Sequence, residues 1–112
     1  MYNHDDLKPK EETIMTINKQ QNGNILTLAP QGRLDTVTSP ELEAELKNSL
    51  DGVESLVLDL SGLEYISSAG LRVLLSAHKT MSVRSGMKVT NAGEIVREVF
   101  EVTGFSDILN IE

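Results

Sequence analysis

The sequence predicts an α/β domain with a mixed four- to five-stranded sheet, in which a β-hairpin is followed by βα units whose helices pack on the sheet. Two short segments alternate apolar and polar residues on either side of Asn22-Gly23, a dipeptide that supplies the positive φ of a tight turn. Later apolar segments alternate with amphipathic ones, and a β-α-β order requires parallel strands joined by right-handed crossovers. If each crossover steps to the adjacent strand in the same direction, all helices lie on one face of the sheet.

The first half of the chain supplies the hairpin and one helix. The hairpin strands are expected at residues 15–20 and 25–31. Ser39 is expected to be the N-cap of the first helix and Pro40 its first residue, where a missing N–H costs nothing. Apolar residues then recur every fourth position up to the closing Asp51-Gly52, which indicates an amphipathic helix with Leu42, Leu46 and Leu50 on its buried side.

The second half of the chain is expected to contain three further strands and two helices. A buried strand is expected at 56–58, and Asp59 at its end should bond locally to a loop. A second helix should begin at the serine pair 67–68 and reach about residue 86, before a short strand at 87–90. The third helix should end near Gly104, and residues 108–111 are expected to form a last strand.

Length and composition restrict the possible functions. With 112 residues the chain is expected to be one domain at 14–112, after a disordered leader at 1–13 that is polar and charged. The sequence has no cysteine, which favours a cytoplasmic location, and no segment approaches the roughly 18 apolar residues of a membrane span. A net charge of −7 opposes direct binding to nucleic acid.

A small hydrolase using Ser68 is one alternative, because a serine between strand and helix resembles a nucleophile elbow. The elbow needs a glycine two residues before the serine, and Ile66 stands there. Of the two histidines, His4 lies in the leader and His78 lies about three helical turns beyond Ser68, roughly 15 Å away. No metal-site spacing or P-loop is present. We therefore expect no catalytic residues, no metal, no cofactor and no enzymatic activity.

The serine pair Ser67-Ser68 has two interpretations. One serine caps the helix by accepting a bond from a free N–H, or the same free amides and partial positive charge make this position tolerant of a phosphate. The loop at 32–36 likewise either makes only local bonds or belongs to a site. Because the ends of neighbouring parallel strands converge, we expect Asp35 and Ser68 at the same edge.

Three segments together resemble the STAS-domain anti-sigma-factor antagonists: the run at 32–35, the run at 56–61, and the run at 65–74 that reads Tyr-Ile-Ser-Ser-Ala-Gly-Leu-Arg-Val-Leu. A similar tail follows at 99–109. The resemblance implies a STAS-like fold over the domain and a protein that binds an anti-sigma factor, which is also a serine kinase, so that a sigma factor is released.

The resemblance also implies that the kinase phosphorylates Ser68 and so ends the complex, and that a PP2C-type phosphatase restores it. Ser67 stands where many members carry an aspartate. A STAS module that serves as a scaffold in another signalling or transport complex, with no kinase acting on it, is the alternative function. The partner-binding residues that the resemblance implies are Gly32, Leu34, Asp35, Thr36, Ser67, Ser68, Gly70, Leu71 and Arg72.

Overall fold

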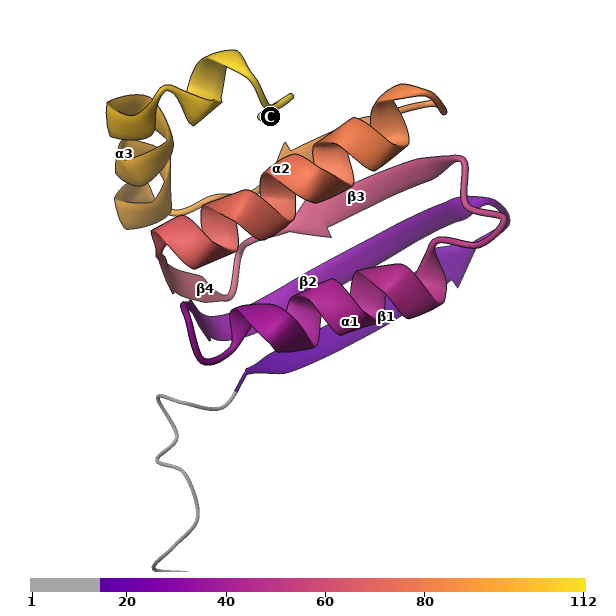
Figure 1. The fold of residues 1–112 in the computed structure, drawn as a ribbon, viewed down its shortest axis with the longest axis horizontal. Coiled ribbons are helices and arrows are strands. Elements are labelled where there is room, and N and C mark those ends of the chain that lie inside the picture. The colour runs from indigo at the N-terminus through magenta and orange to yellow at the C-terminus, as the bar shows by residue number, and fades with distance from the viewer. Residues whose placement is uncertain (1–14) are drawn as a thin grey trace, which may run out of the picture.

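The computed structural model describes residues 15–112, so the expected leader at 1–13 lies outside the described residues. A mixed sheet forms its centre (Figure 1). Its strands are β1 (Thr16–Asn22), β2 (Ile25–Leu34), β3 (Ser55–Asp59), β4 (Leu63–Ile66) and β5 (Met87–Thr90). Strand β2 pairs antiparallel with β1 and parallel with β3 and β4, and β3 pairs parallel with β5. The predicted α/β fold with a mixed sheet is thereby confirmed.

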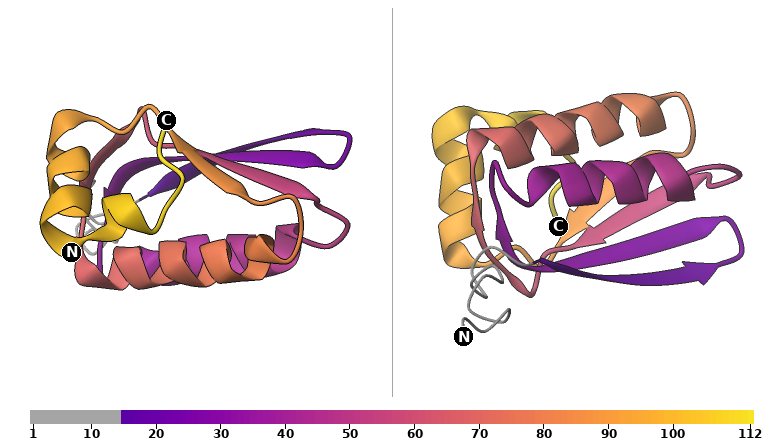
Figure 2. Two further views of the ribbon diagram at one scale, coloured as in Figure 1. Left: turned by 90° about the horizontal axis from the view of Figure 1, so that it is seen from above. Right: turned by 60° about the horizontal axis from the view of Figure 1, so that its bottom comes forward.

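Two helices cover one face of this sheet. Figure 2 shows α1 (Ser39–Ser49) and α2 (Ser68–Ser82) side by side beneath the strands, as the crossover rule predicts for steps in one direction. The same expectation is wrong for α3 (Glu94–Thr103), which lies across one end of the sheet and contacts β4. This helix follows the edge strand β5 and leads to no further strand of the sheet, so no crossover constrains it.

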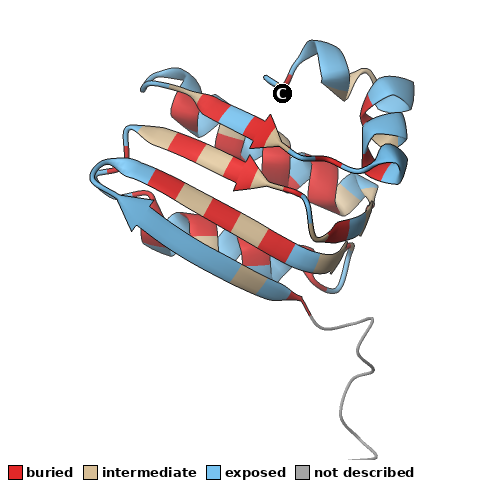
Figure 3. Cartoon of the chain, turned by 180° about the vertical axis from the view of Figure 1, so that it is seen from behind, coloured by how far each residue is buried: buried red, intermediate tan, exposed pale blue. Residues whose placement is uncertain are grey.

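The core lies between the sheet and these two helices. Residues of β2 and β3 alternate in burial along each strand, as Figure 3 shows from the face without helices. Leu28 and Leu58, paired across the two strands, are fully buried, as are Leu42 of α1 and Leu74 of α2. The period of two in the strands and the leucine spacing in the helix therefore identified the buried faces correctly.

Three details differ from the sequence predictions. Strand β4 was not predicted, and it lies where the sequence indicated only a loop. Thr38, not Ser39, is the N-cap of α1, because Ser39 is already helical. The Thr38 hydroxyl makes no capping bond and donates instead to the carbonyl of Arg33 in the preceding turn. Residues 108–111 form no strand: a single bridge joins Ile111 to Val89 after a short 3-10 turn at Phe105–Asp107.

The additional strand is possible because β2 changes its parallel partner along its length. Its first residues pair with β3, up to Leu28 opposite Leu58, whereas Gly32 is the first to pair with β4. Pro30, which has no N–H to donate, lies in the stretch between these two pairings. Gly32 has a φ of 108° at the point where the register with β4 shifts, a conformation that favours glycine.

Gly70 allows the first turn of α2 to approach the end of the sheet closely. A Cβ atom at this position would lie 2.8 Å from Cγ1 of Ile66 and 2.8 Å from Cγ of Leu34. Both side chains are fully buried, so neither has room to move away. The glycine of the serine run therefore sets the distance between α2 and the strands.

We expect Gly70→Ala to lower the free energy of unfolding by about 1–3 kcal/mol, because the added methyl group overpacks this contact. Gly93→Ala is the matched control, since a Cβ there meets nothing within 4 Å. The control should lose clearly less stability in urea denaturation of the two variants and wild type. Equal losses would contradict the close-packing role of Gly70.

Candidate functional site

Ser67 and Ser68 stand where β4 passes directly into α2. The N–H of Ser67 donates to the carbonyl oxygen of Leu34 at 2.9 Å, which joins the end of β4 to the end of β2. The carbonyl of Ser67 then accepts the N–H of Leu71 at 2.9 Å and starts the helix. Because β2 ends at Leu34, the loop that begins with Asp35 lies at the same edge as Ser68, as the sequence predicted.

The two serines differ in how exposed they are. Ser67 is the N-cap of α2 with an extended backbone, yet its side chain makes no capping bond, and its Oγ is buried without a partner within residues 15–112. Ser68 is the first helical residue and is exposed. The simple capping interpretation is thus wrong for Ser67, and the first-turn amides of α2 have no side-chain cap from it.

Asp35 organises the loop between β2 and α1. Its Oδ1 accepts the N–H of Val37 at 3.0 Å and the N–H of Thr38 at 3.1 Å. The buried Thr38 hydroxyl accepts the N–H of Asp35 at 2.9 Å and donates to the carbonyl of Arg33 at 2.6 Å. The loop is closed by bonds within it, so the local bonding of Asp35, one of the two interpretations that the sequence left open, is confirmed.

Arg33 connects this loop to β4. Its guanidinium lies over the ring of Tyr65, 4.3 Å from the ring centroid, and the two residues are paired across the parallel strands. Nε of Arg33 is also 3.8 Å from Oδ2 of Asp35. Cation–π contacts of this kind contribute about 0.5–1 kcal/mol at exposed sites. Loop, β2 and β4 therefore form one connected edge.

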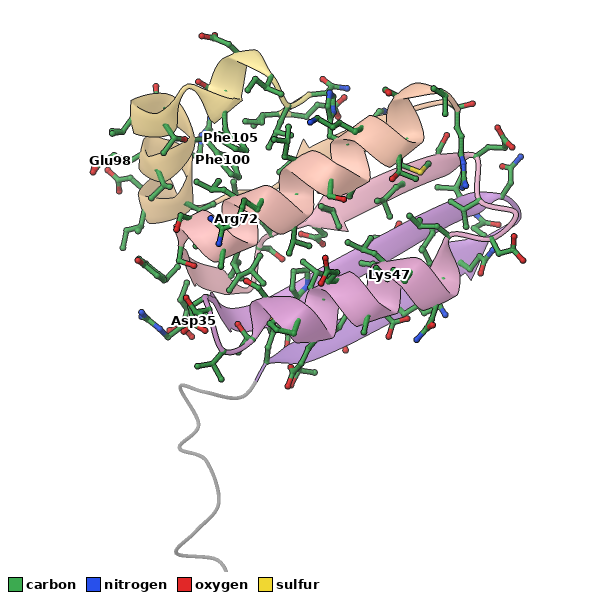
Figure 4. All side chains as sticks on the ribbon, in the orientation of Figure 1. Asp35, Lys47, Arg72, Glu98, Phe100 and Phe105 are labelled. Atoms are coloured by element: carbon green, nitrogen blue, oxygen red, sulfur yellow. The ribbon has the colours of Figure 1, made fainter. Side chains whose placement is uncertain are left out.

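The nine residues singled out in the sequence divide by exposure. Thr36, Ser68 and Arg72 are exposed and available to a partner. Figure 4 shows Arg72 and Asp35 on neighbouring parts of this edge. The other six form two groups: Gly32, Asp35 and Ser67 are half-buried, while Leu34, Gly70 and Leu71 are buried.

Val37 is the residue of this edge that sequence reasoning missed. It sits in the closed loop between Asp35 and Thr38, and 63% of its surface is exposed. An apolar side chain exposed on an internally bonded loop is a suitable contact for a protein partner, because little further ordering is needed on binding. The available signal in the sequence was the position of Val37 between Asp35 and Thr38, two residue types that favour turns.

A second carboxylate, Asp59 at the end of β3, bonds locally as the sequence predicted. Its Oδ1 accepts the N–H of Ser61 at 3.0 Å and Nδ2 of Asn91 at 3.1 Å. These bonds lower the pKa of Asp59, because they favour its charged form. Asp59 therefore ties the β3–β4 connection to the loop after β5.

One hollow of the surface lies between the two helices that cover the sheet. The groove between α1 and α2 has a volume of about 590 Å³ and is lined by Lys47 and Arg84 among others. Arg84 donates to the carbonyls of Leu50 and Val53, at 2.6 and 2.8 Å, and so closes the end of α1. Among residues 15–112 no cluster of side chains could hold a metal ion, and no helix there is long and apolar enough to cross a membrane.

Comparison with known proteins decides the family. The model of the STAS domain family matches residues 16–112. The chain belongs to the STAS domain family. A relative from Bordetella bronchiseptica, BtrV, described as a candidate anti-sigma factor antagonist, is 43% identical over 83 residues, 72% of each chain.

Solved structures show the same fold. An anti-sigma factor antagonist from Mycobacterium paratuberculosis has a TM-score of 0.81 at 25% identity, over 88% of this chain and 86% of that one. SpoIIAA of Bacillus in its phosphorylated form has a TM-score of 0.67 at 15% identity, over 87% and 91%. The resemblance stated from the sequence is thus confirmed, and the STAS protein described here is related to regulators that are not enzymes.

The Asp35 carboxyl gives this STAS domain a testable pH dependence. Its burial raises the pKa, but the N–H groups of Thr38 and Val37 and the Arg33 guanidinium outweigh this, so the pKa is lowered from 3.8. A lowered pKa in the folded state means that the stabilisation is present above the pKa of the unfolded chain and is lost as pH falls through the folded value.

We therefore expect Asp35→Ala to reduce the free energy of unfolding at pH 7 by about 1–2 kcal/mol, through loss of the bonds that close the loop. The difference from wild type should shrink below about pH 4, where the carboxyl of the wild type protonates. Urea denaturation across pH 2.5–7 measures it. A difference that stays constant over this range would show that the Asp35 charge does not stabilise the loop.

Proposed function

We propose that this STAS protein is an anti-sigma-factor antagonist that binds an anti-sigma factor with serine-kinase activity and is released from it by phosphorylation of Ser68. One observation carries the proposal: Ser68 is exposed as the first residue of α2, at the same edge as the internally bonded loop that presents Val37. The relatives support the same role, since the Mycobacterium paratuberculosis protein is described as an anti-sigma factor antagonist and BtrV as a candidate one.

Ser68 is the better acceptor of the two serines. A kinase needs access to the hydroxyl oxygen, and Oγ of Ser67 is buried whereas Ser68 is exposed. Ser68 also lies at the start of a helix, where the partial positive charge of the free N–H groups makes a phosphate tolerable. That SpoIIAA has a phosphorylated form supports a modified state within this fold. A PP2C-type phosphatase is the enzyme that we propose reverses the modification.

Phosphorylation should act on recognition more than on folding. The phosphate adds about −1.5 to −2 charges at a surface that a partner must cover. If a carboxylate of the partner lies about 5 Å away, each added charge costs on the order of 3 kcal/mol at an effective dielectric near 20. A change from about 90% to 10% bound needs roughly 80-fold in affinity, or about 2.6 kcal/mol, so this repulsion is sufficient.

We expect phosphorylated protein to bind the cognate anti-sigma factor at least about 80-fold more weakly than unmodified protein, with a melting temperature changed by no more than a few degrees. Ser68→Ala should bind as wild type and resist release by ATP, and Ser68→Asp should bind measurably more weakly. Titration calorimetry with ADP present, together with thermal melts, measures both quantities.

Ser67→Ala is the matched control and should still be released by ATP. Equal affinity of the phosphorylated and unmodified forms would refute the switch. If the unmodified protein captures no kinase-type anti-sigma factor from its own cells, the scaffold role in another complex becomes the better account.

A second expectation concerns Val37. Replacing it with Ser should weaken binding to the anti-sigma factor about 5- to 30-fold, or about 1–2 kcal/mol, because an exposed apolar contact is lost. Val83→Ser is the matched control: Val83 is 87% exposed at the opposite end of α2 and should leave the affinity unchanged. Neither change should alter the melting temperature noticeably. Equal losses of affinity in the two variants would remove Val37 from the interface.

A further inference from the structure

Arg72 is the one charged side chain among residues 68–77, the first ten of α2. It is exposed, and it forms no ion pair with any residue between 15 and 112. The first turn of the helix holds no acidic side chain either. The start of α2 thus has an uncommitted guanidinium and no carboxylate of its own to occupy it.

The position of Arg72 relative to Ser68 is favourable for an intramolecular ion pair. Residues four apart lie on the same face of a helix, and long side chains in helices point back toward the N-terminus. An anionic residue that precedes a cationic one by four positions is also the more stabilising order. Figure 4 shows Arg72 close to the start of α2, where Ser68 stands.

The other charged groups of this edge are less suited than Arg72 to bind a phosphate on Ser68. Arg33 is already engaged by the Tyr65 ring and by Asp35. The Asp35 carboxylate accepts the N–H groups of its own loop. Glu64 on β4 is exposed, and its negative charge would repel a phosphate instead of holding it. Arg72 is the cation of this edge without a partner among the described residues.

We propose that Arg72 is the intramolecular ligand of a phosphate on Ser68, so that the modified residue is held against the first turn of α2. This proposal rests on the proposed function in one respect, namely that Ser68 is phosphorylated. Phosphorylation then changes the surface twice: it adds about two negative charges and it withdraws the guanidinium of Arg72 from the partner. Arginine suits this role because its planar donors match a phosphate in a bidentate manner.

The test needs no kinase. Protein carrying phosphoserine at position 68, installed during translation, is titrated by ³¹P NMR as wild type, Arg72→Gln, Arg72→Lys and Lys79→Gln. Lys79 is the matched control, since it is exposed on the same helix eleven residues on, about 16 Å from Ser68 along the axis. A cation next to the phosphate favours the dianion, so the second phosphate pKa should be lowest where the cation is present.

We expect the phosphate pKa to rise by about 0.4 in Arg72→Gln, to rise less in Arg72→Lys, and to stay unchanged in Lys79→Gln. Phosphorylation should also lower the melting temperature by about 2–4 °C more in Arg72→Gln than in wild type. Identical titration curves for wild type and Arg72→Gln would overturn the proposal. This outcome is independent of the proposed function, which fails instead if unmodified wild type does not bind a kinase-type anti-sigma factor.

Discussion

The pairing of β4 with the last residues of β2 is the constraint on which the site depends. The bond from the N–H of Ser67 to the carbonyl of Leu34 fixes the point where β4 ends and α2 begins. Gly70 then lets α2 approach Leu34 and Ile66, so the helix start is held by backbone and core together. Ser68 is consequently displayed at the start of a helix whose position is fixed by buried parts of the chain.

Most of the fold could be predicted because its signals are local. The alternation in the hairpin, the leucine spacing of α1 and the order of strands and helices all follow from side-chain period and turn residues. Strand β4 could not be predicted in this way. It has only four residues. It becomes a strand because β3 pairs with β2 only as far as Leu28 and leaves that side of β2 available further on, which is a property of another segment.

The sequence predicted where the candidate site lies in the fold, but not which of its residues are exposed. Sequence reasoning brought Asp35 and Ser68 to one edge, because the ends of parallel strands converge. It could not separate the exposed residues from those that hold the edge together, since burial depends on the whole fold. Leu71 and Gly70 belong to the same run as Ser68 and Arg72, yet the first two are buried and the last two exposed. A motif of this kind combines packing residues and exposed residues in one stretch of chain.

The proposed switch requires this division, because a modification at Ser68 must change binding without unfolding the domain. The groups that maintain the edge, namely the loop bonds of Asp35, the Leu34 carbonyl and the packing at Gly70, lie behind the surface on which Ser68 is exposed. In the proposed switch a phosphate on Ser68 lies at the exposed start of α2 instead of among buried apolar groups, so its expected cost to the folded state is small. In the proposed switch Arg72 holds this phosphate at the surface that a partner would cover, and the expected response is a change in affinity.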